Sequence, residues 1–201
     1  MAGKPKPVTV GVLALQGDVR EHLNVLEGLG VATTKVRRPE ELTQIDGLVI
    51  PGGGSSVIDK LTRLFGIRAP LQRLISDGLP VYGTCAGLIM LAHSILDGIE
   101  GQQSLDAIDM DVRRNAFGSQ VDSFETELDV PVLGEQPMHT VFIRAPIVER
   151  VGPRVTTLAT LDDGRIVAVE QGFVLATSFH PEMTGDTRFH EYFVDRVRRV
   201  A

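Results

Sequence analysis

Cysteine is nearly absent from this sequence, which has one residue, Cys85, in 201. A single cysteine excludes a disulfide within the chain and is typical of proteins from a reducing compartment. Histidines and cysteine at zinc-binding spacing are also missing, so we expect no metal site. Positive charge is not in excess either, because the net charge is −6. This balance argues against non-specific binding of nucleic acid.

Long apolar runs are missing as well. The run Val8 to Leu15 is too short to span a membrane and lacks a small-residue cleavage site. We therefore expect a cytoplasmic protein. Internal repeats and low-complexity segments do not divide the chain. We expect residues 1–7, which are basic and rich in proline, to form a flexible lead, and residues 8–201 to form a single domain.

The first half of the sequence alternates between apolar runs and segments with helical periodicity. Asp18 stands where it could cap the first helix. Strands are expected at 8–15, 31–36, 47–50 and 79–82, and helices at 19–29, 57–65, 70–76 and 88–95, with a short helix or turn at 39–42. This order predicts a doubly wound α/β domain with a mostly parallel central sheet and helices on both faces.

The second half has shorter strands and predicts a small antiparallel extension. Residues 108–112 alternate between apolar and acidic side chains, which is typical of a half-buried antiparallel strand. Further strands are expected at 138–143, 155–161, 166–169 and 173–179, with residues 162–164 (Asp-Asp-Gly) as a hairpin turn. Residues 187–200 predict a closing helix with Phe189, Phe193, Val197 and Val200 on its apolar side.

The single cysteine lies in the sequence Gly83-Thr84-Cys85-Ala86-Gly87, between a strand-like and a helix-like run. This arrangement is typical of a nucleophile elbow, with cysteine where hydrolases carry serine. Glycine on both sides suits a strained turn, and the start of a helix favours a thiolate. The alternative is a buried structural cysteine, because free cysteine is among the most buried residue types.

His180-Pro181-Glu182 follows the last predicted strand. Pro181 keeps His180 extended, and residues two apart in an extended segment face the same side. A thiol nucleophile needs a base, and the base needs an orienting carboxylate, so these residues could complete a triad with Cys85. The alternative is a surface histidine beside a helix-capping glutamate. We take the remaining histidines, His22, His93, His139 and His190, as structural.

Three glycines, Gly52, Gly53 and Gly54, follow the third predicted strand. The residues after them match neither a P-loop nor a dinucleotide-binding fingerprint. Backbone amides of such a loop could form an oxyanion hole together with the amide of Ala86, with Gly53 as the loop's donor. The alternative is a simple turn before a helix.

Together these residues resemble class I (triad) glutamine amidotransferases, on the elbow at 83–87, the loop at 51–55 and the run 179–182. Other runs are similar to a narrower family, the glutaminase subunits of pyridoxal 5'-phosphate synthase. They are residues 13–22 (LALQGDVREH), 114–125 (RNAFGSQVDSFE) and 141–146 (VFIRAP). The similarity extends over essentially the whole chain from Val8 to Val200.

The resemblance implies a flavodoxin-like fold and hydrolysis of L-glutamine to glutamate and ammonia without a cofactor. It implies that Cys85 is the nucleophile, His180 the general base and then acid, and Glu182 the residue that orients the histidine. The implied partner is a (β/α)8-barrel synthase subunit, which uses the ammonia to build pyridoxal 5'-phosphate from a pentose phosphate and a triose phosphate.

The resemblance also implies a glutamine-binding set. Its residues are Gly52, Gly53, Gly54, Arg114, Ile143 and Arg144. An arginine suits a substrate carboxylate because its guanidinium group can bind two oxygens at once, whereas we expect the neighbouring Arg113 to be solvated. Gly54 stands where the family usually has glutamate in Pro-Gly-Gly-Glu-Ser, so any contact of that carboxylate is missing here.

Two other functions stay open from the sequence. The chain could be the glutaminase of another amidotransferase, such as imidazole glycerol-phosphate synthase. It could also be a non-catalytic flavodoxin-like module with a redox-sensing cysteine. The runs at 15–22 and 114–120 argue against the first, and the His-Pro-Glu run argues against the second, because a sensor cysteine needs no oriented base.

Overall fold

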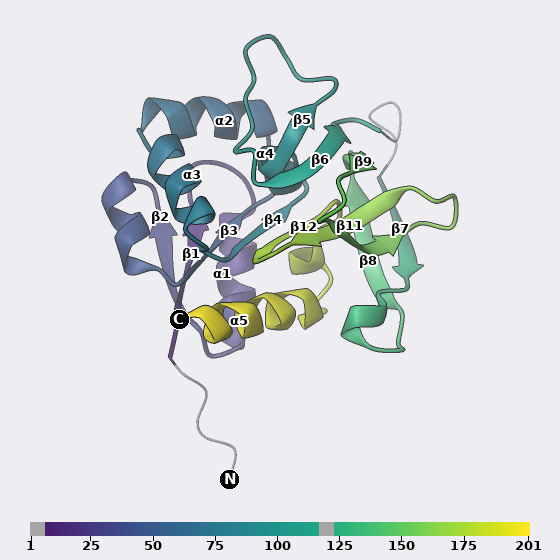
Figure 1. Ribbon diagram of the computed structural model, residues 1–201. Helices are drawn as coiled ribbons and strands as arrows, with labels where there is room; N and C mark the ends of the chain where they lie inside the picture. The colour runs from purple at the N-terminus through teal and green to yellow at the C-terminus, as the bar shows by residue number, and fades with distance from the viewer. Residues whose placement is uncertain (1–6, 117–122) are drawn as a thin grey trace.

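A ten-stranded mixed sheet forms the centre of the structure, a computed structural model that describes residues 7–116 and 123–201 (Figure 1). One side of the sheet is parallel, in the order β2-β1-β3-β4-β12. These strands are β1 (Thr9–Leu13), β2 (Ala32–Val36), β3 (Gly47–Ile50), β4 (Val81–Thr84) and β12 (Val174–Thr177). This is the strand order of a flavodoxin-like fold, which the resemblance implied.

Beyond β12 the sheet becomes mainly antiparallel, in the order β11-β9-β6-β5, with β10 beside β11. The bounds are β5 (Ala92–Ile95), β6 (Ile108–Arg113), β9 (Ile147–Val151), β10 (Thr156–Thr160) and β11 (Ile166–Gln171). A separate antiparallel pair is formed by β7 (Ser123–Leu128) and β8 (Met138–Ile143). The predicted antiparallel extension is therefore present.

Helices cover both faces of the parallel strands (Figure 1). On one face, α1 (Val19–Gly28) and α5 (Arg188–Val200) pack in one apolar cluster with Val10 and Val12. On the other, α2 (Ser55–Leu64), α3 (Arg68–Ser76) and α4 (Ala86–Leu91) pack with Leu48 and Ile50. Short 3-10 helices occur at η1 (Pro39–Gln44), η2 (Pro131–Leu133) and η3 (Pro181–Met183). This confirms the predicted doubly wound arrangement.

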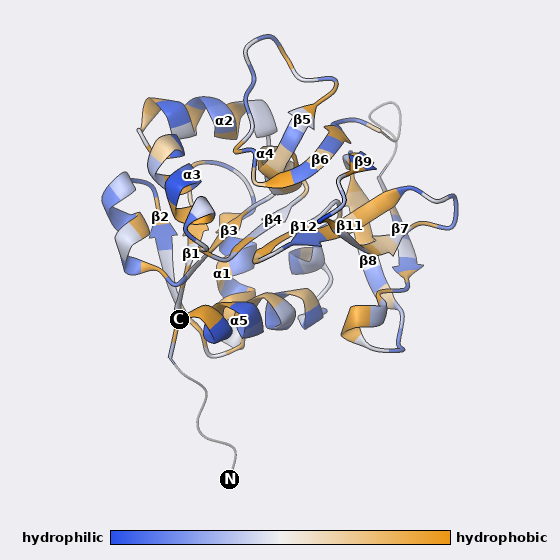
Figure 2. Cartoon of the chain, viewed as in Figure 1, coloured by the Kyte–Doolittle hydropathy of each residue, from blue (hydrophilic) through white to orange (hydrophobic). Residues whose placement is uncertain are grey.

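Burial of the central strands explains why their sequences are mostly apolar and carry no charged residue. Every residue of β3, β4 and β12 is buried, and Figure 2 shows the concentration of apolar residues in the middle of the sheet. Strands covered on both faces have no solvent side for polar residues. In α5, Phe189, Phe193 and Val197 are fully buried as predicted, but Val200 is exposed because it lies in the last turn of the helix.

Several local predictions were wrong. The helix expected at 88–95 ends at Leu91, and residues 92–95 form β5, which pairs in parallel with β6. A short apolar run fits either conformation, and here the free backbone groups of β6 favour a strand. Strands β7 and β9 were not predicted. Strand β6 was expected to be antiparallel, and it is so toward β9 but parallel toward β5.

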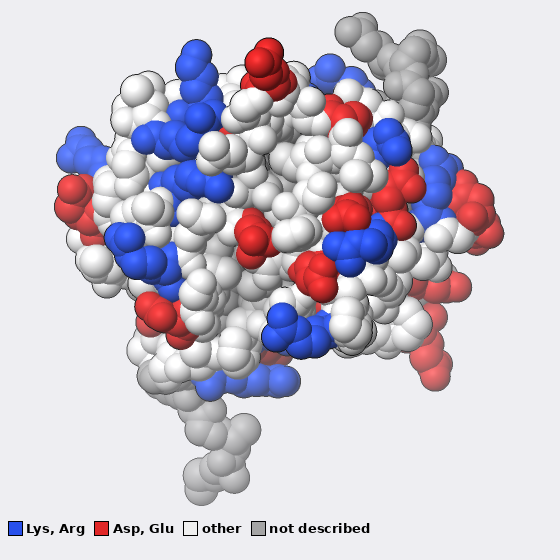
Figure 3. All heavy atoms as spheres, turned by 45° about the horizontal axis from the view of Figure 1, so that its top comes forward, with Lys and Arg blue, Asp and Glu red and all other residues white. Residues whose placement is uncertain are grey.

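Charged side chains are unevenly distributed over the face shown in Figure 3. Lysine and arginine gather over the side that carries α2 and α3, whereas acidic and basic side chains alternate on the opposite side. None of the helices in the described ranges is both long and apolar enough to cross a membrane. Residues 1–6 of the predicted flexible lead and residues 117–122 of the 114–125 run lie outside the described residues.

Candidate functional site

The candidate site lies at the carboxyl ends of four neighbouring parallel strands, β1, β3, β4 and β12. The segments that follow these strands are residues 14–18, residues 51–54, Cys85 and residues 178–182. Parallel strands bring their carboxyl ends to one edge of the sheet, which is where open α/β folds bind ligands. Residues far apart in the sequence therefore meet there.

Cys85 forms the turn between β4 and α4 in a strained conformation, with φ 48° and ψ −102°. Its N–H donates to the carbonyl of Thr177 on β12 over 2.8 Å, which fixes the turn to the sheet. The flanking glycines are needed for close packing. A Cβ on Gly83 would lie 2.5 Å from the carbonyl carbon of Gly87, and one on Gly87 would lie 2.1 Å from the oxygen of Ile50. The strain is thus carried by Cys85 itself.

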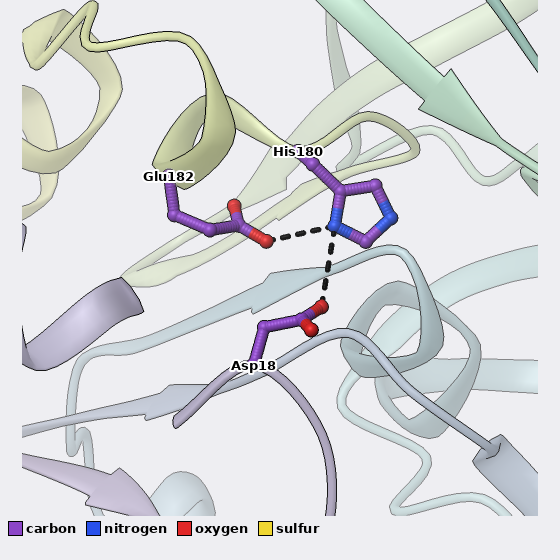
Figure 4. Close-up of side chains that lie close together, drawn as sticks. All are labelled: Asp18, His180 and Glu182. Carbon is purple, nitrogen blue, oxygen red and sulfur yellow. Dashed lines mark hydrogen bonds and ion pairs between the residues drawn. The ribbon is translucent and has the colours of Figure 1, made fainter. Parts of the chain in front are cut away.

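His180 and Glu182 are buried and directly hydrogen-bonded, with 2.7 Å between His180 Nδ1 and Glu182 Oε1 (Figure 4). The predicted route to this contact was wrong, because the segment is not extended. Pro181 begins the 3-10 helix η3, and the turn brings Glu182 back toward the ring. Proline suits the first position of a helical turn because its fixed φ is already helical and it needs no N–H donor there.

Asp18 approaches the same imidazole from the loop after β1. Its Oδ2 lies 3.5 Å from His180 Nδ1, and Figure 4 shows the two carboxylates on different sides of that nitrogen. Asp18 is the N-cap residue of α1, as predicted, but its side chain makes no capping hydrogen bond and faces His180 instead. Partial burial raises the pKa of Asp18, and the nearby His180 opposes this shift.

The surroundings of His180 favour its protonated form. Burial lowers the pKa of the imidazole, but interactions with Cys85 and Glu182 outweigh this effect and raise the pKa to about 10. Burial raises the pKa of Glu182, and the hydrogen bond and charge of His180 oppose that shift. The two ions would each be costly to bury alone, and here each one stabilises the charge of the other.

A pocket of about 150 Å³ opens beside Cys85. It is lined by Gly53, Gly54, Ser55, Cys85, Ile89, Arg114, Asn115, Ile143 and Arg144. The structure thus brings most of the expected glutamine-binding residues together with the cysteine. Gly52 is the exception. It lies beneath the histidine, where an added Cβ would be 2.5 Å from His180 Cε1.

Arg114 is held at the pocket by two other segments. Its backbone N–H donates to Asp97 Oδ1 over 2.7 Å, and its guanidinium group donates to Gln102 Oε1 over 3.2 Å. The amide nitrogen of Gln102 donates in turn to Ser55 Oγ over 3.0 Å. Arg144, which also lines the pocket, has a φ of 45°, a conformation that is uncommon for residues other than glycine.

The glycine loop is bound to the segment after β1. The carbonyl of Gly52 accepts from the N–H of Asp18 over 3.2 Å, and the N–H of Gly54 donates to Gln16 Oε1 over 2.7 Å. A trans peptide directs its carbonyl and N–H to opposite sides, so the N–H of Gly53 points away from Asp18. Ala86 is the first residue of α4, where an N–H has no partner within the helix.

Sequence reasoning missed several residues around the site. Gln16, Gln102 and Asn115 were not singled out, although Gln16 lies in the 13–22 run and Asn115 in the 114–125 run. His22 and His190 were taken as structural, but both are fully buried and His22 lies beside Glu182. The run that contains His22 was the available signal, because it belongs to the resemblance.

Three side chains of the site also lie close enough together to hold a metal ion. Among the described residues, ligand atoms of Asp18, His180 and Glu182 lie within 4.8 Å of one another. However, the hydrogen bond to Glu182 uses His180 Nδ1, the ring nitrogen that would have to bind the cation. The arrangement therefore fits an oriented base better than a cation site.

The fold and this site define the class of protein: a flavodoxin-like domain with cysteine, histidine and glutamate at the carboxyl edge of the sheet, as in triad glutamine amidotransferases. A crystal structure of a glutamine amidotransferase is similar with a TM-score of 0.88 and 48% identity, covering 94% of this chain and 98% of that one. The structure of PurLQS from Thermotoga maritima has a TM-score of 0.68 at 16% identity, which shows the shared fold alone.

Residues 12–199 match the SNO glutamine amidotransferase family, and the chain belongs to this family. One relative is the pyridoxal 5'-phosphate synthase subunit PdxT of Leifsonia xyli subsp. xyli (strain CTCB07), 66% identical and covering 98% of both chains. Another is the subunit of the same name from Clavibacter michiganensis subsp. michiganensis (strain NCPPB 382), 65% identical over 94% of this chain and 90% of the relative.

Proposed function

We propose that this protein hydrolyses L-glutamine to L-glutamate and ammonia, as the glutaminase subunit of a pyridoxal 5'-phosphate synthase. The observation that carries the proposal is the interaction of Cys85 with His180, which Glu182 holds by a hydrogen bond, beside a pocket lined by Arg114. The near full-length similarity to subunits named PdxT supports the same function and does not favour another amidotransferase. A redox sensor would not need the oriented histidine.

In the proposed reaction, Cys85 is the nucleophile and His180 accepts its proton. The thiolate attacks the carboxamide carbon of glutamine, and His180 then protonates the departing ammonia. Water hydrolyses the resulting thioester and releases glutamate. Glu182 holds the ring by its 2.7 Å hydrogen bond to Nδ1, so that Nε2 is free for proton transfer. The raised pKa of His180, about 10, means that the imidazolium formed by this proton transfer is stabilised where it stands.

The proposed oxyanion hole consists of the N–H groups of Gly53 and Ala86. The Gly52–Gly53 peptide supports this role, because its carbonyl is bound to Asp18 and its N–H is directed the other way. Donors held in place before the reaction stabilise the developing negative charge without reorganisation. Removing one such donor typically costs about 10²–10³ in rate.

The proposed glutamine-binding residues are Gly52, Gly53, Gly54, Arg114, Ile143 and Arg144. Those that line the pocket supply two guanidinium groups and loop backbone next to Cys85. An arginine suits the α-carboxylate of glutamine because it can bind both oxygens. Gly52 contributes by leaving room for the imidazole ring.

The proposed partner is a (β/α)8-barrel synthase subunit that consumes the ammonia. We propose that the hetero-oligomeric complex is cytoplasmic, because Cys85 must stay a free thiol, and that residues 8–201 act as one glutaminase domain. The discriminating experiment measures glutamate release with and without the cognate synthase, and pyridoxal 5'-phosphate formation from glutamine. A partner other than this synthase in a pull-down would indicate a different amidotransferase.

A further inference from the structure

A pair of buried histidines lies directly behind the proposed triad. His22, on α1, has no exposed surface, and its Nε2 lies 3.6 Å from Glu182 Oε1 and 3.1 Å from Thr84 Oγ1. Its Nδ1 lies 2.9 Å from Nε2 of His190 on α5. Helices from distant parts of the sequence thus meet at the carboxylate that binds His180, and the reaction described above uses neither histidine.

We propose that His22 is a positioning residue: its neutral Nε2–H donates to Thr84 Oγ1 over 3.1 Å and presents its positive end to Glu182 Oε1, 3.6 Å away, which keeps that carboxylate aimed at His180. His190 has a supporting part, because it sets which nitrogen of His22 carries the proton. This inference rests on the triad proposed above and adds a residue that acts through Glu182.

Both histidines are in surroundings that favour the uncharged ring. Burial lowers the pKa of His22 well below its ordinary value, and the nearby His190 and His180 lower it further. Burial lowers the pKa of His190 to about 4. Glu182, the carboxylate beside His22 in the described part of the chain, is engaged by His180. A protonated His22 would compete for Glu182, whereas a neutral N–H donor holds it without cancelling its charge.

The hydrogen-bond pattern determines the tautomer. If His22 carried its proton on Nδ1, its Nε2 lone pair would face Glu182, and the Nδ1–H of His190 would be a buried donor with no partner among the described residues. If His190 donates from Nε2 instead, His22 Nδ1 accepts and its Nε2–H faces Thr84 and Glu182. In that case the atom left without a hydrogen-bond partner among the described residues is an acceptor, His190 Nδ1. A buried acceptor without a partner costs less free energy than a buried N–H without one.

The other groups around the pair do not change this assignment. The ring of Tyr82 meets His190 edge-on, with 5.7 Å between the centroids, and its hydroxyl is 3.1 Å from Thr177 Oγ1. Burial raises the pKa of Tyr82 well above its ordinary value, so the phenol stays neutral. Asp18 faces His180 and not His22. Glu182 is therefore the negatively charged group that His22 positions.

The test uses two substitutions that differ in where they place a donor. His22→Gln puts an amide nitrogen near the position of Nε2, whereas His22→Asn puts one near Nδ1. In the synthase-bound protein, we expect His22→Asn to lower kcat for glutamate release by about tenfold, the scale of one buried hydrogen bond, with KM unchanged. His22→Gln should restore most of the rate. Equal kcat for both variants, after melting curves show that both are folded, would contradict the inference.

A second measurement separates this inference from the triad itself. Glu182→Gln should lower kcat with little change in KM, because the loss falls on orientation of the base. If His22 acts through Glu182, then His22→Asn should cost little more in the Glu182→Gln background, as a double-mutant cycle would show. Unchanged kcat in Glu182→Gln alone would overturn the triad. Full additivity would overturn only the role of His22.

A third measurement needs no substitution and decides the matter if the variants fail to fold. Nitrogen NMR of imidazole-labelled protein reports the tautomer of each histidine. We expect His22 to be neutral and protonated on Nε2 throughout the pH range of activity. A His22 protonated on Nδ1, or charged, would overturn the inference.

Discussion

At the scale of single residues, the site combines one strained backbone with one strongly perturbed side chain. Cys85 has the strained backbone, and the packing of Gly83 and Gly87 against their neighbours maintains it. His180 has the perturbed side chain, since a buried imidazole would ordinarily lose its proton more readily than an exposed one. The second feature depends on the first residue, because Cys85 helps to raise the pKa of His180.

The first prediction concerns the nucleophile. Cys85→Ala should abolish glutamate release while the fold and synthase binding are retained, because a smaller side chain fits the same turn. Activity is measured by glutamate release, and binding by titration with the synthase. Turnover within tenfold of the unsubstituted protein would rule out Cys85 as the nucleophile.

The second prediction concerns the proton on His180. Its pKa is raised to about 10 by Cys85 and Glu182 against the lowering effect of burial. Removing one of the raising groups should therefore lower the value, so the imidazole of Cys85→Ala should lose its proton at a lower pH than that of the unsubstituted protein. NMR titration of His180 checks this. An identical titration midpoint in both proteins would mean that Cys85 does not support the charge.

At the scale of elements, the glycine loop after β3 is shaped by the two loops next to it. Gly52 packs under His180 and accepts a hydrogen bond from Asp18, and Gly54 donates one to Gln16. The loops after β1, β3 and β12 thus hold one another at the edge of the sheet. Displacing any of them should disturb the oxyanion hole and the base together.

The third prediction compares two alanine substitutions in this loop. A Cβ on Gly52 would lie 2.5 Å from His180 Cε1 and 2.8 Å from Asp18 Oδ2, whereas a Cβ on Gly54 would meet Val57 at 3.4 Å, an ordinary contact. Gly52→Ala should therefore lower kcat by about 10²-fold or more, the scale of a lost oxyanion donor or misplaced base. Gly54→Ala should change it little. Equal effects of the two substitutions on glutamate release would contradict this account.

At the scale of the whole molecule, the site is built at one edge of the sheet and opens beside Cys85, so a partner could receive ammonia there. Hydrolysis without a synthase would waste glutamine, which favours coupling of activity to partner binding. Glycine peptides in the oxyanion loop can reorient at little steric cost. A partner that binds one loop conformation better would shift the population toward it.

The fourth prediction follows from this coupling and from Gly54. The isolated protein should be nearly inactive, and titration with synthase should activate it. Gly54→Glu should fold normally, because a Cβ there has space, and it should raise the stimulated rate or tighten synthase binding. Maximal turnover without synthase would contradict the coupling. Identical titration curves for both proteins would mean that this position tolerates either residue.

The sequence by itself determined the order of strands and helices in the first half and pointed to the three residues of the proposed triad. It did so because both signals are local. Apolar runs report burial on both faces of a sheet, and the elbow and the His-Pro-Glu run need particular residue types at fixed spacing. The sequence did not predict strands whose conformation depends on a partner strand: β5 was expected to be helical, and β9 was not expected at all.

Only the tertiary structure decided which polar residues surround the triad. From the sequence, Asp18 was predicted to cap a helix and His22 to be structural, because each residue type commonly has that role within its own segment. Their contacts with His180 and Glu182 join segments more than 150 residues apart, and His22 reaches His190 across a sequence separation of 168. No local pattern encodes such contacts. They arise because parallel strands gather their carboxyl ends at one edge, where α1 and α5 bury these side chains together.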